Sequence, residues 1–229
     1  MAGEKILMHC CCGPCSSACV ERLAPDYDIT LFFYNPCIDD RDEYEKRKEN
    51  LIKLVEAINR NGYVGVAEEN GSNGEGGSEA GADGVDKQLA DDQKSSSANG
   101  TTVTPLAYGP VKVVEGKYDP ENYLEAVRGL EGEPEGGARC AVCFRIRLEE
   151  AARYAKDNGF DGFTTTLTVS PHKNYRVISE IGREVAEEAG IEYYPFDFKK
   201  KDGFLHSIWL SKAYGLYRQD YCGCGFSKR

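Results

Sequence analysis

Alternating apolar and charged stretches divide the chain into short buried strands and amphipathic helices. Residues 29–34 (ITLFFY) form a continuous β-branched and aromatic run, which is typical of a strand covered on both faces. Residues 42–59 have a helical pattern in which the apolar positions form one narrow stripe. Further strands are predicted at 5–9, 63–67, 162–168 and 191–194, and further helices at 16–23, 120–129, 140–158, 174–189 and 207–217.

The order of these elements predicts the fold class. Residues 5–67 give strand, helix, strand, helix, strand, which is the signature of a parallel sheet covered by helices. We therefore predict a single α/β domain over residues 1–229, with a parallel sheet and flanking helices in a Rossmann-like or nucleotide-hydrolase-like arrangement. No internal repeat is visible.

One long segment breaks this rhythm. Residues 70–104 are rich in Gly, Ser, Asn, Asp and Ala and contain almost no large apolar residues. Such a composition cannot bury enough surface to offset the entropy lost on ordering, so we predict a disordered insertion that acts as a solvated linker. Between Glu68 and Ala107, eight acidic and two basic residues contribute −6 to the net charge of −10. The rest of the chain is only mildly acidic, so charge neither excludes nor indicates RNA binding.

The overall composition is that of an ordinary globular protein, with 41% hydrophobic and 29% charged residues. No apolar run approaches the roughly 18–20 residues that a membrane span needs. The stretch before the first cysteine is too short for a signal peptide, so we expect a cytoplasmic location and no membrane partner. In a reducing compartment, ten cysteines indicate metal or redox chemistry rather than a disulfide framework.

Seven of the cysteines form three groups that are far apart in the sequence. They are Cys11, Cys12 and Cys15 in a strand-to-helix turn, Cys140 and Cys143 at the start of a helix, and Cys222 and Cys224 in a glycine-rich tail. Ligands of open parallel sheets gather at the carboxyl ends of the strands, and helix N-termini stabilise thiolates. All-thiolate sites hold zinc or iron–sulfur clusters. One CxxC, one adjacent pair and one CxC do not make two regular zinc knuckles, which favours a [4Fe–4S] cluster and leaves zinc as the alternative.

Six longer motifs carry a family resemblance. They are HCCCGPCS at 9–16, FFYNPCI at 32–38, PEGGARCAVCFRIRLEEAA at 134–152, FTTTLTVSPHKN at 163–174, DFKKKDGF at 197–204 and LYRQDYCGCGFS at 216–227. In sequence and order they resemble the epoxyqueuosine reductase family of the QueH type, over nearly the whole chain except the insertion. The resemblance implies reduction of epoxyqueuosine to queuosine at the tRNA wobble position. The epoxide becomes an alkene with uptake of two electrons and two protons and release of water, without cobalamin and with an unidentified electron donor.

The resemblance also implies roles for the cysteines. It makes Cys11, Cys12, Cys140 and Cys143 the ligands of the cluster. Cys222 and Cys224 become a redox-active pair or additional metal ligands, and Cys15 becomes a potential further ligand, on a second iron. Cys10 stands where the family pattern requires no cysteine, so the choice among the three neighbours Cys10, Cys11 and Cys12 stays open.

Other polar residues are candidates for proton transfer and for RNA contacts. The departing oxygen needs a proton donor, for which the candidates are Asp197, His172 and Tyr221. The loop after the predicted strand 162–168 either binds phosphate or ribose or is an ordinary turn; its candidates are Thr164, Thr165, Thr166, Ser170, Lys173 and Asn174. Three arginines beside the CxxC either contact anticodon phosphates or form a solvated helix face: Arg139, Arg145 and Arg147. Cys19 is predicted to be a buried structural residue, and Cys37 to have a surface, packing or functional role.

Two other functions are compatible with a cysteine-rich α/β protein. An adenylating tRNA-thiolation enzyme would need a Gly-rich, Ser-bearing phosphate loop after the first strand, but here the turn is CCCGPCS. A non-catalytic, zinc-stabilised RNA-binding module would be colourless, whereas an iron–sulfur protein is brown. A thioredoxin-like oxidoreductase fits poorly because no strand immediately precedes CAVC.

Overall fold

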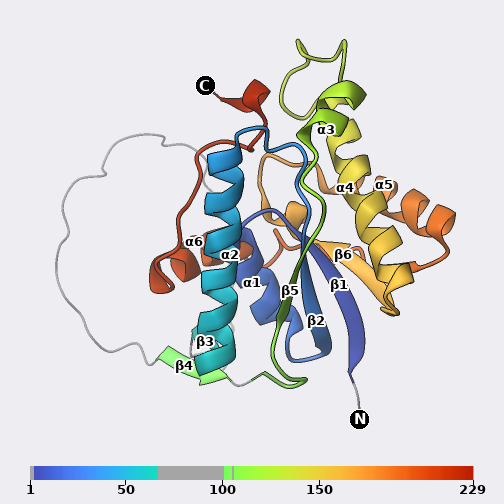
Figure 1. Cartoon of the computed structure of the whole chain (residues 1–229). Helices are drawn as coiled ribbons and strands as arrows, with labels where there is room; N and C mark the ends of the chain where they lie inside the picture. The colour runs from blue at the N-terminus through green and yellow to red at the C-terminus, as the bar shows by residue number, and fades with distance from the viewer. Residues whose placement is uncertain (1–2, 67–100, 105, 229) are drawn as a thin grey trace, which may run out of the picture.

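The fold is built on one sheet of five parallel strands. In the computed structural model, which describes residues 3–66, 101–104 and 106–228, the strands are arranged in the order β5-β2-β1-β6-β7 (Figure 1). Their bounds are Glu4–Cys10 (β1), Tyr27–Phe33 (β2), Lys112–Glu115 (β5), Gly162–Thr165 (β6) and Glu192–Tyr193 (β7). The predicted α/β class with a parallel sheet is confirmed.

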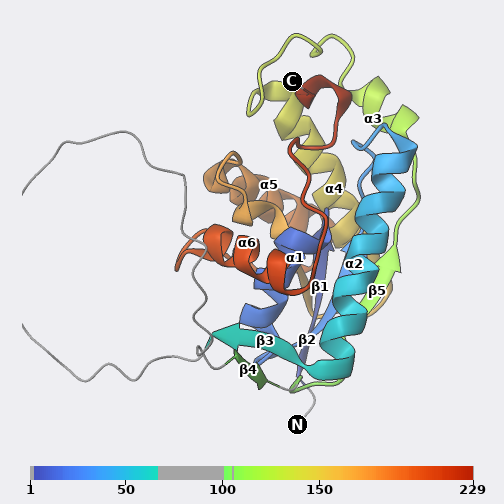
Figure 2. The ribbon, with the colours of Figure 1, turned by 90° about the vertical axis from the view of Figure 1, so that its left-hand side faces the viewer.

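Helices cover both faces of the sheet. Figures 1 and 2 show one layer that contains α1 (Gly13–Leu23), α2 (Arg41–Asn61) and α6 (Gly203–Ala213), and a second layer with α4 (Ala138–Asp157) and α5 (Tyr175–Ala189). The short α3 (Pro120–Ala126) packs against α4, and 3₁₀ turns occupy Thr166–Val169 (η1) and Gly225–Ser227 (η2). Among the described residues, no helix is long and apolar enough to cross a membrane.

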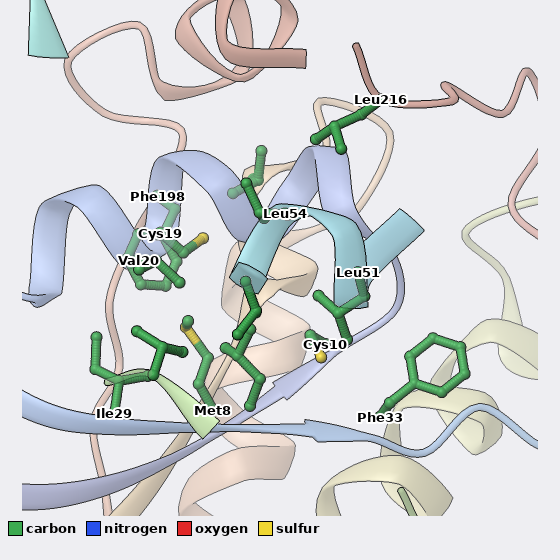
Figure 3. Close-up of a cluster of buried hydrophobic side chains, with 14 of the residues drawn as sticks. Met8, Cys10, Cys19, Val20, Ile29, Phe33, Leu51, Leu54, Phe198 and Leu216 are labelled. Carbon is green, nitrogen blue, oxygen red and sulfur yellow. The ribbon is translucent and has the colours of Figure 1, made fainter. Parts of the chain in front are cut away.

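The central strand β1 is buried on both faces because its side chains alternate between two apolar clusters. Met8 and Cys10 belong to the cluster under α1 and α2 (Figure 3), whereas Leu7 packs in the second cluster with Leu148 of α4 and Ile178 of α5. This burial anchors β1 in the middle of the sheet. The turn that follows Cys10 is therefore held at the centre of the carboxyl edge.

The strand predicted at 63–67 does not join the parallel sheet. Residues Tyr63–Val66 (β3) pair in antiparallel register with Thr101–Thr104 (β4) in a separate two-stranded sheet. The β-branched TTVT run supplies the antiparallel partner of β3, and β5 pairs with β2 in the parallel sheet. Sequence analysis missed β5 because it is short and carries charged residues at both ends. Residues 101–104 of the predicted insertion are thus a strand, and residues 70–100 lie outside the described residues.

Several further boundaries differ from the prediction by a few residues, and two of the differences have a clear local cause. The strand predicted at 162–168 ends at Thr165, whose hydroxyl accepts a hydrogen bond from the Leu167 amide at 3.1 Å and so starts the 3₁₀ turn. The last helix begins at Gly203 rather than at 207. At this start a Cβ would lie 1.9 Å from the Phe198 carbonyl oxygen, so only glycine fits.

Substitution of Gly13, the first residue of α1, should test how tightly α1 packs on α2. A Cβ at Gly13 would lie 2.7 Å from the backbone oxygen of Asn50 in α2. We expect Gly13→Ala to lower the free energy of unfolding by about 1–3 kcal/mol, the usual cost of overpacking, as measured by urea denaturation. In the matched control Gly132→Ala, the new Cβ meets no atom within 4 Å. Equal losses in the two variants would contradict the close helix contact.

Candidate metal centre

The topology of the sheet places a binding site beside β1. From β1 the chain proceeds outward to β2 and β5, then crosses to the other side of β1 to form β6 and β7. In open α/β sheets, ligands bind where the strand order reverses in this way, outside the carboxyl ends of the strands. A pocket of about 240 Å³ lies at this point, between the turn after β1 and the loop after β6. Its lining residues include Cys11, Cys15, His172, Lys173, Tyr221 and Cys222.

The turn after β1 brings three thiols together. The Sγ atoms of Cys11, Cys12 and Cys15 all lie within 4.8 Å of one another, and in the described part of the chain no other group of three potential metal-ligand residues is this compact. Cys12 is the N-cap of α1, and Pro14 in the first turn favours a helix start. Hydrogen bonds with Cys12 and Cys15 lower the pKa of Cys11 well below its ordinary value. The turn is therefore suited to hold a thiolate and a metal.

A second thiol pair lies in the same region. The Cys37 thiol, in the loop after β2, is only 2% exposed and forms a hydrogen bond with Cys143 of α4. This bond lowers the pKa of Cys37 to about 6, and the guanidinium groups of Arg147 and Arg47 act in the same direction. A surface role for Cys37, one of the predicted alternatives, is therefore wrong. Cys19 is buried in the core, as predicted.

The other predicted cysteines lie at separate places around this edge. Cys140 accepts a hydrogen bond from the Gly136 amide at 3.2 Å, and neither it nor Cys143 belongs to the compact group at the β1–α1 turn. Cys222 lines the pocket, whereas Cys224 is buried and hydrogen-bonded to Tyr123. All ten cysteines are free thiols, so Cys222 and Cys224 are not joined by a disulfide.

The tail that carries Cys222 and Cys224 is held along α2 (Figure 2). Lys53 donates to the Gly215 carbonyl oxygen, and the Asn50 side chain accepts from the Tyr217 amide at 2.8 Å. One turn further along α2, Arg47 donates to the carbonyl oxygens of Tyr221 at 3.2 Å and Cys222 at 2.9 Å. Near the N-terminus of α2, Asp40 pairs with Lys228. This series of contacts brings Cys222 to the pocket.

Removal of the Arg47 side chain is expected to destabilise the protein strongly. Arg47 is 1% exposed, and its Nε lies 2.6 Å from Glu43 Oε1 in a buried ion pair. Arg47→Met leaves the Glu43 carboxylate buried and without its cation, which costs about 3–5 kcal/mol of unfolding free energy. The matched control on the same helix is Arg41→Met, which breaks an exposed pair with Glu45 and should cost about 0–1 kcal/mol. Chemical denaturation measures both; similar losses would contradict the role of Arg47.

Two of the three arginines near the CxxC are buried, which corrects their interpretation as a solvated helix face. Arg139 donates to the carbonyl oxygens of residues 130, 131 and 133 and so holds the loop before α4. Arg147 is 2% exposed and lies among the thiols. Only Arg145 is on the surface, where it pairs with Glu149, Glu184 and Glu188. The helix pattern did not reveal this burial because charged residues rarely occupy a core face.

The predicted proton donors and RNA-binding residues are divided between the pocket and the core. His172, Lys173, Ser170 and Tyr221 line the pocket. The other candidates do not line the pocket. Asp197 accepts a hydrogen bond from the Lys199 amide, and Asn174 caps α5. Thr165 and Thr166 are buried, and Thr164 donates to the Tyr194 carbonyl oxygen.

Sequence analysis missed one contact at the compact thiol group. The Gln219 side-chain amide donates to Cys12 Sγ at 3.0 Å. Gln219 lies in the motif at 216–227, but its residue type alone does not indicate a contact with a thiol. Only the path of the tail along α2 brings it to Cys12.

Comparison with known proteins identifies the family. A family model described as "Epoxyqueuosine reductase QueH" matches residues 6–71 and 94–229. The chain belongs to the QueH family of epoxyqueuosine reductases. The match includes every thiol-bearing segment of the site and leaves out residues 72–93, which fall within the predicted insertion.

Individual QueH proteins are similar over almost the whole chain. A curated "Epoxyqueuosine reductase QueH" from Streptococcus pyogenes is 35% identical over 225 residues, which cover 98% of this chain and 71% of the relative. The protein of the same name from Acinetobacter baylyi is 31% identical, with 99% and 81% coverage, and that from Thermotoga maritima is 28% identical, with 97% and 89% coverage. The resemblance noted from the six motifs is confirmed.

Proposed function

We propose that this protein reduces epoxyqueuosine to queuosine in the anticodon of tRNA. Family membership supports the reaction. The observation that carries it to this site is the meeting of thiols from two distant segments at the pocket, Cys11 and Cys15 of the turn after β1 and Cys222 of the tail. The reaction removes the epoxide oxygen as water, leaves a carbon–carbon double bond and consumes two electrons and two protons. The electrons come from an external donor, and the reaction takes place in the cytoplasm with its tRNA substrate.

The residues at this edge fit an anionic, thiolate-ligated group. Thiols lie beside Arg147 and Lys173, and neither cation forms an ion pair with a carboxylate in the described part of the chain. We propose Cys11, Cys12, Cys140 and Cys143 as ligands of a [4Fe–4S] cluster, with Cys15 available to a second iron. A bound cluster supplies single electrons to the reaction. Since two electrons are needed, Cys222 and Cys224 act as a dithiol pair or hold the second iron.

The pocket is suited to an extruded modified base. At about 240 Å³ it is small, and it has polar groups on several sides. An enzyme that acts on a tRNA base takes the base out of the stack and reads its polar edge in such a pocket. His172 and Tyr221 are the two predicted proton donors that line it, and we assign protonation of the departing oxygen to this pair. Lys173 and Ser170 are placed to bind ribose or phosphate of the same nucleotide.

The proposal is tested on protein purified without oxygen. We expect a brown protein with iron and acid-labile sulfide that, with a chemical reductant, removes one oxygen atom from epoxyqueuosine in tRNA, as measured by mass spectrometry of the nucleosides. A colourless protein with stoichiometric zinc and no turnover would overturn the proposal in favour of a zinc-stabilised RNA-binding module. ATP-dependent sulfur transfer to tRNA would overturn it in favour of an adenylating thiolation enzyme.

A further inference from the structure

Arg147 has a buried hydrogen-bond donor that no protein atom satisfies. The side chain extends from α4 one turn after Cys143, and its Nε donates to the Cys143 carbonyl oxygen at 3.0 Å. Its Nη2 is fully buried and has no hydrogen-bond partner in the described part of the chain. A buried donor without an acceptor costs about 1–3 kcal/mol, and more when the group is charged. A bound group that offers an acceptor at this position would remove this cost.

The charge of Arg147 is also without a carboxylate partner. The ring of Phe144 lies 5.6 Å from the guanidinium carbon and shields it from solvent. Burial alone would lower the pKa of Arg147, but the thiols of Cys143, Cys37, Cys222 and Cys11 raise it overall, so sulfur atoms are the source of negative charge around it. Of the other buried arginines, Arg47 pairs with Glu43. Arg139 also has an unpartnered Nε, but its Nη1 donates to three carbonyl oxygens of the loop before α4 and no thiol of the described residues surrounds it.

We propose that Arg147 is the buried counter-ion of the metal centre, with Nη2 donating to the anionic group that the thiols bind, and that its charge sets the reduction potential of that group. The inference rests on the proposed function, and it adds a role for a residue that neither binds the metal nor contacts the tRNA. Cys143 links metal binding to the position of the counter-ion. Its side chain is a proposed ligand, and its carbonyl oxygen accepts the hydrogen bond that orients the Arg147 guanidinium.

The direction of the effect follows from electrostatics. Each electron that enters the centre adds one negative charge, and a fixed cation in a low-dielectric site stabilises the more negative, reduced state. Hydrogen bonds to the sulfur atoms of a cluster raise its potential in the same direction. Removal of the guanidinium should therefore make the midpoint potential more negative.

The test compares three variants by anaerobic redox titration of the cluster. Arg147→Gln removes the charge, and Arg147→Lys keeps the charge but loses the planar donor fork. Arg153→Gln is the matched control, because it removes one arginine charge from the same helix at an exposed position where Arg153 pairs with Glu150 and Asp157. We expect the most negative potential for Arg147→Gln, a smaller negative shift for Arg147→Lys, and the wild-type potential for Arg153→Gln.

The outcomes separate this inference from the proposed function. Circular dichroism and the iron and sulfide content show first whether each variant is folded and loaded. A loaded Arg147→Gln protein with the wild-type potential would overturn the inference while the reductase proposal stands. If Arg147→Gln does not fold, Arg147→Lys decides, and an unchanged potential overturns the inference. A wild-type protein without iron and sulfide would instead contradict the proposed function itself.

Discussion

A protein in which Cys11 and Cys12 are both replaced by serine is expected to lose its bound iron and its reductase activity together. The two thiols lie 3.8 Å apart at the end of the central strand, in the one compact group of three thiols among the described residues. Serine oxygen is a poor ligand for a site built for thiolates. Changes to groups that only support metal ligands already lower metal affinity about 10–100-fold, so loss of two proposed ligands should exceed that range.

The measurement is the iron and sulfide content of the variant, together with turnover of epoxyqueuosine in tRNA. Cys19→Ser is the matched control, because Cys19 lies on α1, the helix that follows Cys11 and Cys12, but is buried in the apolar core and belongs to no compact thiol group. We expect the control to retain iron and turnover with some loss of thermal stability. Full iron content in the double variant would show that other thiols hold the cluster.

Replacement of Cys222 by serine is expected to abolish turnover while the absorbance of the cluster is retained. Cys222 lines the pocket together with Cys11 and Cys15, and of these three only Cys11 is a proposed cluster ligand. In the proposed function the Cys222 sulfur lies beside the bound base, so its loss removes the dithiol partner or a ligand of the second iron while the four cluster ligands remain. Cluster absorbance, iron content and single-turnover product formation are measured on the same sample.

Two further variants show how Cys222 acts. Cys224→Ser should also abolish turnover if the two cysteines work as a dithiol, since each is then needed to form the disulfide. Cys19→Ser, which removes a buried thiol outside the tail, is the control for the loss of a single cysteine. Normal turnover in Cys222→Ser would end the assignment of this cysteine to the reaction.

The sheet was predictable from the sequence where strands are apolar on both faces. The runs that became β1 and β2 show this pattern, and the helices between the strands have clear apolar stripes. The short strand β5 was missed because it carries little periodic signal, whereas β3 was predicted as a strand but assigned to the wrong sheet. Whether such a strand joins the main sheet depends on which partner is nearby in space, and the partner of β3 lies beyond the long segment that follows it.

The grouping of Cys11, Cys12 and Cys15 was predictable because one short turn after a buried strand carries all three thiols. The surrounding residues were not. Arg47 and Arg147 occur in helices full of charged residues, and only the three-dimensional structure shows that they are buried. The contact of Cys37 with Cys143 joins segments more than a hundred residues apart, which no local pattern records. Burial of charge is a tertiary property that the helical period does not encode.

The β3–β4 pair determines where the chain tolerates insertions and deletions. Val66 and Thr101 are direct register partners, so the two ends of the intervening stretch are tied together by the C-terminal end of α2 (Figure 1). The tail with Cys222 is held by Arg47 in the N-terminal half of the same helix. Each doubling of a loop's length adds only about 0.6 kcal/mol to the cost of closing it. Insertions and deletions between these two strands are therefore nearly neutral for folding and leave the reactive edge of the sheet in place. The same position can accept an affinity tag or a fluorophore with little effect on the chemistry.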